Sequence, residues 1–203
     1  MSNNYYAVVR STDNHLEHYG IPGMKWGVRK AIKRVTDSVA SIGRKGAKVS
    51  NEVLFVSGSS KTQDKASPYY QRKLPKPVRK NLKASIRAKD TIIVGDAPGI
   101  DRQTQNYLKK KRYMNVEVYG PGTKVRYSAN SKWKTHPIND THHEVGSKEW
   151  LAKKDIAMTN RATKGLAVIL DEGATATRNN IKRLSSQKKA SSVYTLYPRK
   201  KKR

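Results

Sequence analysis

The sequence predicts an α/β fold, with an open, mostly parallel sheet that carries helices on both faces and follows a basic N-terminal extension. The first observation is that apolar runs without polar alternation occur at 53–56, 91–94 and 166–170, as is typical of strands covered on both faces. The second is that segments with helical spacing separate these runs, and this alternation favours a parallel sheet with right-handed crossovers. The third is that a loop containing glycine and hydroxyl residues or a carboxylate follows each run.

The composition indicates one folded domain with polar ends. A chain of 203 residues with a mean hydropathy of -0.83 can bury one modest core. We expect a domain at 51–197, an N-terminal extension at 1–50 and a basic tail at 198–203. No apolar run reaches the ~20 residues of a membrane span, and the start lacks a signal-peptide pattern. We therefore expect no membrane contact and no secretion by a signal peptide. Zero cysteines exclude disulfides and thiolate metal sites.

The elements of the domain follow in order along the chain. Pro77 suits a first helical turn, and Val78, Leu82 and Ile86 then give one helical face. Residues 61–74 and 123–146 lack clean periodicity, and we predict an irregular connection and a long loop or lid there. The predicted order is strand 53–56, helix around 77–86, strand 91–94, helix 103–112, strand 116–119, helix 147–162 with Trp150, Leu151, Ile156 and Ala157 among its apolar positions, strand 166–170, helix 178–187 and strand 193–196.

The N-terminal extension has a different character. Residues 5–9 could form a short strand, and apolar residues spaced among lysines and arginines at 31–49 predict a basic amphipathic helix that ends near Gly43. Between them, residues 15–29 place large apolar side chains on a segment with three glycines and a proline, which excludes a long regular element. That pattern favours a docking peptide over a core, and the alternative is an ordinary loop.

Charge is the strongest global signal. The chain has 43 Lys+Arg against 15 Asp+Glu, a formal net charge of +28. Such an excess predicts nonspecific, salt-dependent binding to nucleic acid, because neutralised phosphates release counterions; the alternative is a solvated basic surface. Helix-dipole compensation is a competing explanation for the first of two clusters. The clusters are Lys109, Lys110, Lys111 and Arg112 at the end of a predicted helix, and Arg199, Lys200, Lys201, Lys202 and Arg203 at the end of the chain.

Three loops are expected to form a ligand pocket. They follow the runs at 53–56, 91–94 and 166–170, and parallel strands bring their carboxyl ends to one edge of the sheet, where ligands bind. Glycines allow backbone to approach a phosphate, Asp101 can cap the next helix, and helix N-termini favour anions. The predicted contacts are Gly58, Ser59, Ser60, Gly95, Asp96, Gly99, Asp101, Thr175 and Thr177.

Histidines in the segment 123–146 suggest a metal site, but we do not predict one. His136, His142 and His143 are the three histidines there. No carboxylate or cysteine stands at metal-ligand spacing beside them. The alternative of a loop or lid is favoured.

Together the loops resemble the SLOG superfamily, the Rossmann-like group that includes LOG phosphoribohydrolases and DprA-type proteins. The resemblance rests on VLFVSGSS at 53–60, GDAPGID at 95–101, Asn160-Arg161 before a strand, and DEGATAT at 171–177. It implies a Rossmann-like domain in which glycine loops hold the phosphate and sugar of a nucleotide-like ligand. Arg161, with Asn160, would then contact the phosphate. No cofactor is identified beyond such a nucleotide-derived ligand.

The last of these loops departs from the family pattern. Enzymatic LOG proteins resemble PGGxGTxxE, whereas this chain has Ala176-Thr177 in place of Gly-Thr, with Asn180 three places later. If the protein is an enzyme, the resemblance implies a phosphoribohydrolase-like cleavage of an N-glycosidic bond. Asp171 and Glu172 are then the candidate catalytic carboxylates near a ribose, or alternatively caps of the next helix.

The N-terminal segment HYGIPGMKWGVRK resembles the HxGxxGMKWG motif of many tailed-phage proteins encoded among head and structural genes. The resemblance implies a phage-encoded protein, located in the virion or the host cytoplasm, whose residues 15–29 contact phage structural proteins. Two hypotheses follow. The chain binds or processes a nucleotide in its pocket, or it is a basic structural or DNA-associated protein whose fold is a scaffold.

Overall fold

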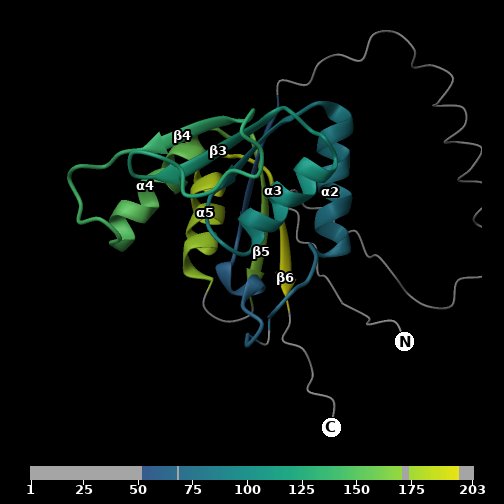
Figure 1. The fold of residues 1–203 in the computed structure, drawn as a ribbon, viewed down its shortest axis with the longest axis horizontal. Helices are drawn as coiled ribbons and strands as arrows, with labels where there is room; N and C mark the ends of the chain where they lie inside the picture. Colours follow the sequence, from purple (N-terminus) through teal and green to yellow (C-terminus); the bar gives the residue numbers. More distant parts are fainter. Residues whose placement is uncertain (1–51, 68, 171–173, 197–203) are drawn as a thin grey trace, which may run out of the picture.

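The computed structural model describes residues 52–67, 69–170 and 174–196, and it confirms the predicted fold class. These residues form a six-stranded, all-parallel, Rossmann-like sheet in the order β4-β3-β2-β1-β5-β6, flanked by four α-helices (Figure 1). The elements are β1 (Val53–Gly58), the short 3-10 helix η1 (Ser60–Gln63), α2 (Lys76–Ala88), β2 (Thr91–Gly95), α3 (Ile100–Lys110), β3 (Val116–Pro121), β4 (Lys134–Ile138), α4 (Lys148–Arg161), β5 (Lys164–Leu170), α5 (Thr175–Ser186) and β6 (Ser191–Leu196).

The helices cover the two faces in pairs, α2 and α3 on one and α4 and α5 on the other (Figure 1). Alternation along the central strands builds both layers, because successive side chains of a strand point to opposite faces. Leu54 and Val56 of β1 pack in the core with α2 and α3. Val53 and Phe55, their neighbours, pack with Met158 of α4. The runs that read as buried strands are therefore buried because a helix layer lies on each side.

Strand β4 corrects the prediction of an irregular segment at 123–146. Residues Lys134–Ile138 pair in parallel with β3, with Tyr119 opposite His136 and Gly120 opposite Pro137. The sequence KTHPI has no apolar run, and proline is tolerated in strands mainly at a sheet edge. Since β4 is the outermost strand and mostly exposed, it needs no hydrophobic pattern, and the sequence gives no strand signal there.

The order of the strands creates a switch point at the carboxyl ends of β1 and β5. From β1 the chain moves outward through β2, β3 and β4, then returns to place β5 against the other side of β1. Crossover connections leave in opposite directions from this point, so the loops after β1 and β5 diverge and leave a crevice. The three predicted loops begin at the carboxyl ends of β1, β2 and β5.

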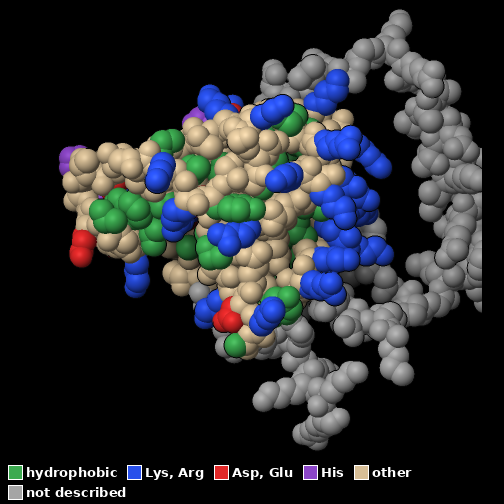
Figure 2. All heavy atoms as spheres, viewed as in Figure 1, with side chains coloured by type: hydrophobic (Ala, Val, Ile, Leu, Met, Phe, Trp, Pro, Cys, Tyr) green, Lys and Arg blue, Asp and Glu red, His purple; other side chains and the backbone are tan. Residues whose placement is uncertain are grey.

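The surface is strongly basic on one side. Figure 2 shows Lys and Arg side chains gathered along α2, with few acidic side chains on this face.

Within the described residues, none of the helices combines the length and apolar character needed to cross a membrane. The expected extension at 1–50, with its strand and helix, and the tail at 198–203 lie outside the described residues.

Candidate functional site

A cleft of about 400 Å³ opens at the switch point. The end of β1, η1, the loop after β2, and parts of α4 and α5 line it, and Phe55, Met158 and Leu170 give it an apolar side. Of the residues predicted from the sequence, the structure brings six together on its walls: Gly58, Ser59, Ser60, Asp101, Thr175 and Thr177. The volume is typical of a small-molecule site.

Gly95 and Gly99 were predicted to let backbone approach a ligand, and the structure gives them a different role. A side chain on Gly95 would collide with the carboxylate of Asp101, and one on Gly99 would collide with the backbone of Ser59 and Ser60. Gly99 also has φ +84, which favours glycine. Neither glycine is among the residues that line the cleft. They shape its wall from behind by allowing protein segments to pack closely.

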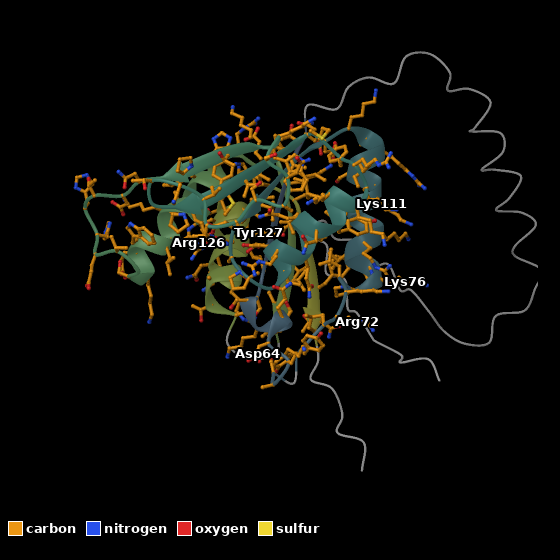
Figure 3. All side chains as sticks on the ribbon, in the orientation of Figure 1. Asp64, Arg72, Lys76, Lys111, Arg126 and Tyr127 are labelled. Carbon is orange, nitrogen blue, oxygen red and sulfur yellow. The ribbon has the colours of Figure 1, made fainter. Side chains whose placement is uncertain are left out.

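Asp96 is also behind the wall, where it holds Arg126. Its buried carboxylate accepts hydrogen bonds from the Arg126 backbone N–H at 2.8 Å and from Nε at 3.0 Å, and a third from Nη2. The Arg126 side chain is 49% exposed and lines the cleft, on the α4 side of α3 (Figure 3). Asp96 therefore positions a cation at the cleft through an Arg–carboxylate pair of the bidentate type.

Asp101 was predicted to cap α3, but it lies inside the first turn. The N-cap is Gly99, which has no side chain to form a capping hydrogen bond. Asp101 is 6% exposed and lines the cleft. Burial raises the pKa of Asp101 to about 7, Lys154 opposes this, and Asp155 and Asp96 add to it. A carboxyl group with such a pKa can accept or donate a proton near neutral pH.

Lys154 and Asp155 form the polar floor of the cleft, and sequence reasoning missed both. Lys154 Nζ donates to Asp155 Oδ1 at 2.6 Å, and both residues are 8% exposed. Burial by itself lowers the pKa of Lys154, but Asp155 and Asp101 outweigh it, so the pKa is raised and the ammonium stays charged. The predicted apolar positions Leu151 and Ile156 are instead among the exposed large side chains. A helix that buries a Lys–Asp pair has no clear apolar stripe. For this reason the apolar residues of α4 did not indicate which of its faces is buried.

Asn180 joins this floor to β1. Its Nδ2 donates to Ser57 Oγ at 3.1 Å and to Asp155 Oδ2 at 3.2 Å, while Arg183 Nη1 donates to its Oδ1 at 2.7 Å. Asn180 is the position where the pattern of enzymatic LOG proteins, PGGxGTxxE, has a glutamate. A carboxylate is still present beside it, because Asp155 lies in hydrogen-bond contact.

The N-terminus of α5 faces the cleft without an acidic side chain. Thr175, Ala176 and Thr177 line the cleft, Ala174 is the N-cap, and no acidic residue occurs in the first turn. Among the described residues, none accepts a hydrogen bond from the backbone N–H groups of 175–177. The N-terminal N–H groups of α5 and the positive end of its helix dipole suit an anion in the cleft. The start of α3 differs, because Gln63 accepts from the Gly99 N–H and Ser59 from the Ile100 N–H.

Asn160 and Arg161 do not belong to the cleft, which corrects their assignment. They lie in the last turn of α4, which ends at the opposite edge of the sheet because the helix runs antiparallel to the strands. Arg161 pairs with Glu117 Oε1 at 3.4 Å, and Asn160 accepts from Gln187 Nε2 at 2.8 Å. Lys154, two turns earlier on α4, lines the cleft, as do the cations Lys61 and Arg126.

The remaining predicted residues divide between exposed and undescribed positions. Lys109, Lys110, Lys111 and Arg112 are exposed at the end of α3. The candidate catalytic residues Asp171 and Glu172, and the cluster 199–203, lie outside the described residues. The histidines make separate contacts: His136 stacks on Tyr119 with centroids 4.5 Å apart, and His143 Nδ1 lies 2.6 Å from Asp140 Oδ2. In the described part of the chain, no group of three or more His, Asp or Glu side chains is arranged to hold a metal ion.

Comparison with known proteins concerns the N-terminal extension. A family model described as a family of unknown function (DUF7211) matches residues 9–33. The matched residues include the whole HYGIPGMKWGVRK segment at 18–30 and none of the cleft. No curated protein matches the chain.

Proposed function

We propose that the cleft binds a phosphate-bearing nucleotide or nucleotide derivative. The observation that carries the proposal is the N-terminus of α5, which presents the backbone N–H groups of 175–177 to a cleft that also contains Lys154 and Arg126. Donors fixed on a helix end and cations in the same cleft suit a phosphate group. The apolar side formed by Phe55, Met158 and Leu170 suits the base or another flat group.

The polar floor suits the sugar. Asp101, Asp155 and Asn180 lie around Lys154, and carboxylate and amide oxygens accept hydrogen bonds from ribose hydroxyls. Asp101, with its pKa near 7, is also the described group best suited to proton transfer if the ligand is cleaved. An assay for cleavage of an N-glycosidic bond is therefore a second test of the same site. Asp171 and Glu172 remain candidate catalytic carboxylates.

Calorimetry with adenine nucleotides, NAD and ADP-ribose tests binding, and a variant at α5 tests its location. Ala176→Asp adds a carboxylate in the first turn of α5, which stabilises the helix by about 0.3–1 kcal/mol but repels a phosphate. Asn179→Asp adds the same charge at an exposed position of α5 outside the cleft. We expect loss of binding in the first variant and retention in the second. Absence of binding by every ligand would leave the scaffold hypothesis as the better one.

We also propose that the protein is phage-encoded and that residues 15–29 contact structural proteins of the virion. The support is the resemblance of HYGIPGMKWGVRK to the tailed-phage motif, in a region that matches a family model separate from the cleft. Mass spectrometry of purified virions tests it. Detection of the parent chain, and its loss from virions after Trp26→Ala, is the expected result; absence of the parent chain from virions contradicts it.

A further inference from the structure

The outer side of α2 carries a continuous basic face. Residues 65–89 contain nine lysines and arginines and no aspartate or glutamate. At 3.6 residues per turn, the five on α2 fall within an arc of roughly 100° and extend for about 17 Å along the helix. We call them the α2 basic face: Lys76, Arg79, Lys80, Lys83 and Arg87.

The core fixes the direction of this face. Val78 and Leu82, on the other side of α2, are 0% exposed and pack in the core with α3 and the sheet. Lys76, Lys83 and Arg87 are exposed. Because Val78 and Leu82 are held in the core, α2 cannot rotate, and its charges stay in one row on the opposite side.

The charges of this row work against the stability of α2. Lys83 stands four residues from both Arg79 and Arg87, and like charges at that spacing repel. Lys76 lies in the first turn, where the helix dipole disfavours a cation and where no acidic residue compensates it. Among the described residues, no carboxylate forms an ion pair with Lys76, Lys83 or Arg87. A stability role does not explain this arrangement, whereas a polyanionic partner does.

The predicted cluster at the end of α3 continues the same surface. Asn115, just after that cluster, donates to the Lys89 carbonyl at 3.2 Å, so the ends of α2 and α3 lie together. Lys111 Nζ is 6.0 Å from the centre of the Tyr107 ring. Burial raises the pKa of Tyr107, and the positive charge of Arg79 of α2 opposes this. Figure 3 shows Lys76 and Lys111 on the α2 side of the molecule, where Figure 2 shows the Lys and Arg side chains gathered.

From this surface we infer that the α2 basic face binds the phosphodiester backbone of a nucleic acid. A row of cations on a fixed helix matches a row of phosphates, and contacts to phosphates carry no sequence information. An anionic membrane fits less well, because helices that lie on membranes insert an apolar face, and the apolar face of α2 is buried in the core. None of the five residues lines the cleft, so this inference does not depend on the proposed nucleotide.

Salt dependence gives the quantitative expectation. Each phosphate contact contributes about 0.9 to the slope of log affinity against log salt on duplex DNA, so five contacts give a slope of about -4.5. Affinity should then fall several hundred-fold between about 50 and 200 mM salt. Fluorescence anisotropy of the full chain with a labelled duplex DNA, a single-stranded DNA and a duplex RNA of arbitrary sequence measures this and separates the possible sources of the phosphates.

Two triple variants with the same loss of charge locate the site. Lys76→Gln, Lys83→Gln and Arg87→Gln together remove three cations from the α2 basic face. Lys134→Gln, Lys148→Gln and Lys182→Gln remove three exposed cations from β4, α4 and α5. We expect the α2 variant to lower affinity at least tenfold and to reduce the slope by about 2 to 3, since three contacts are lost. The control variant should change affinity less than threefold, and circular dichroism should show both variants folded.

Three results would overturn the inference. The first is that the full chain binds none of the three nucleic acids. The second is that the two triple variants lose affinity equally, which would mean that net charge alone produces the binding. The third is that vesicles of equal parts phosphatidylcholine and phosphatidylserine compete with nucleic acid for the parent but not for the α2 variant, which would assign the surface to a membrane. Loss confined to the α2 variant, with no competition by vesicles, supports it.

Discussion

The floor of the cleft and the outer face of α2 use charge in opposite ways. In the cleft, Lys154 is enclosed with Asp155, with which it pairs at 2.6 Å, and with Asp101, and both carboxyl groups raise its pKa. On α2 every charge has the same sign, and Lys76, Lys80, Lys83 and Arg87 are exposed. Buried charges are stable only with their partners, and they shift the pKa values of neighbouring groups. Exposed like charges create an electrostatic field that salt screens. The charges of the cleft therefore hold side chains in fixed positions, whereas the charges of α2 attract anions. Substitutions in the two regions should have different effects.

The largest expected effect is the loss of the buried cation. Lys154→Met leaves Asp155 and Asp101 buried without their lysine, and breaking a buried pair costs about 3–5 kcal/mol. Lys148→Met, at an exposed position of the same helix, should change stability by less than about 0.5 kcal/mol. Urea unfolding at neutral pH measures both. Equal, small effects would show that the floor of the cleft is solvated like the surface.

Substitution of Gly99, which shapes the wall of the cleft, should also lower the free energy of unfolding. Gly99 and Gly146 have similar positive φ values, +84 and +91, but only Gly99 has backbone against the position of a side chain. Gly146→Ala should cost about 1 kcal/mol for the backbone strain alone, and Gly99→Ala clearly more, because the segment Ser59–Ser60 must move. The difference between the two unfolding free energies isolates the close packing. If it is zero, the loop after β2 does not pack against η1.

Asp101 should make the stability of the cleft depend on pH. Its pKa rises from 3.8 in the unfolded chain to about 7 in the folded one, so the folded state binds this proton more tightly. The resulting stabilisation is full below pH 3.8 and is lost as the pH rises to 7. Asp101→Asn removes this dependence, so the parent should lose about 3 kcal/mol relative to the variant between pH 5 and pH 8. Parallel pH profiles for the two chains would contradict the assigned burial.

The smallest effect is expected on α2, and its sign is the informative part. Lys83→Gln removes repulsion with Arg79 and Arg87, so it should stabilise the protein by about 0.5 kcal/mol at low salt. At high salt the gain should vanish, because exposed charges are screened. Thermal unfolding at the two salt concentrations measures it. A destabilised variant would show that Lys83 has a stabilising partner, and the contrast between the two regions would weaken.

The sequence predicted the parts of the fold that depend on continuous burial. The apolar runs of β1, β2 and β5 identify strands because a helix layer covers each face. The order of the strands in the sheet, and with it the switch point, comes from the structure. Strand β4 was missed because an edge strand needs no apolar pattern. The outcome for Gly95 and Gly99 has a similar cause, since sequence shows that a backbone must pass closely but not whether ligand or protein approaches it.

For the cleft, sequence identified the loops but not the charged side chains that complete them. Ser59, Asp101 and Thr177 follow directly from the strand ends. Lys154 lies on a helix face that resembles an exposed one, and Arg126 reaches the cleft only through its pair with Asp96. Arg161 was chosen by family resemblance, and the direction of α4 carries it to the other edge of the sheet. The sequence did contain a signal for Lys154 and Asp155. If both are placed on the solvent side of α4, the apolar residues of this helix do not form one continuous stripe.

The two outer strands differ in how well they resist the addition of another strand. In β4, Pro137 lacks an N–H and Lys134 adds a charge, and both features discourage self-association at a sheet edge. The outermost strand at the other side of the described sheet, β6, has the uncharged sequence SSVYTL, which is rich in residues that favour strands. In the sequence, Pro198 and five basic residues follow it closely. Such residues act as gatekeepers against aggregation, so the tail has a protective consequence for the fold even where no polyanion is bound.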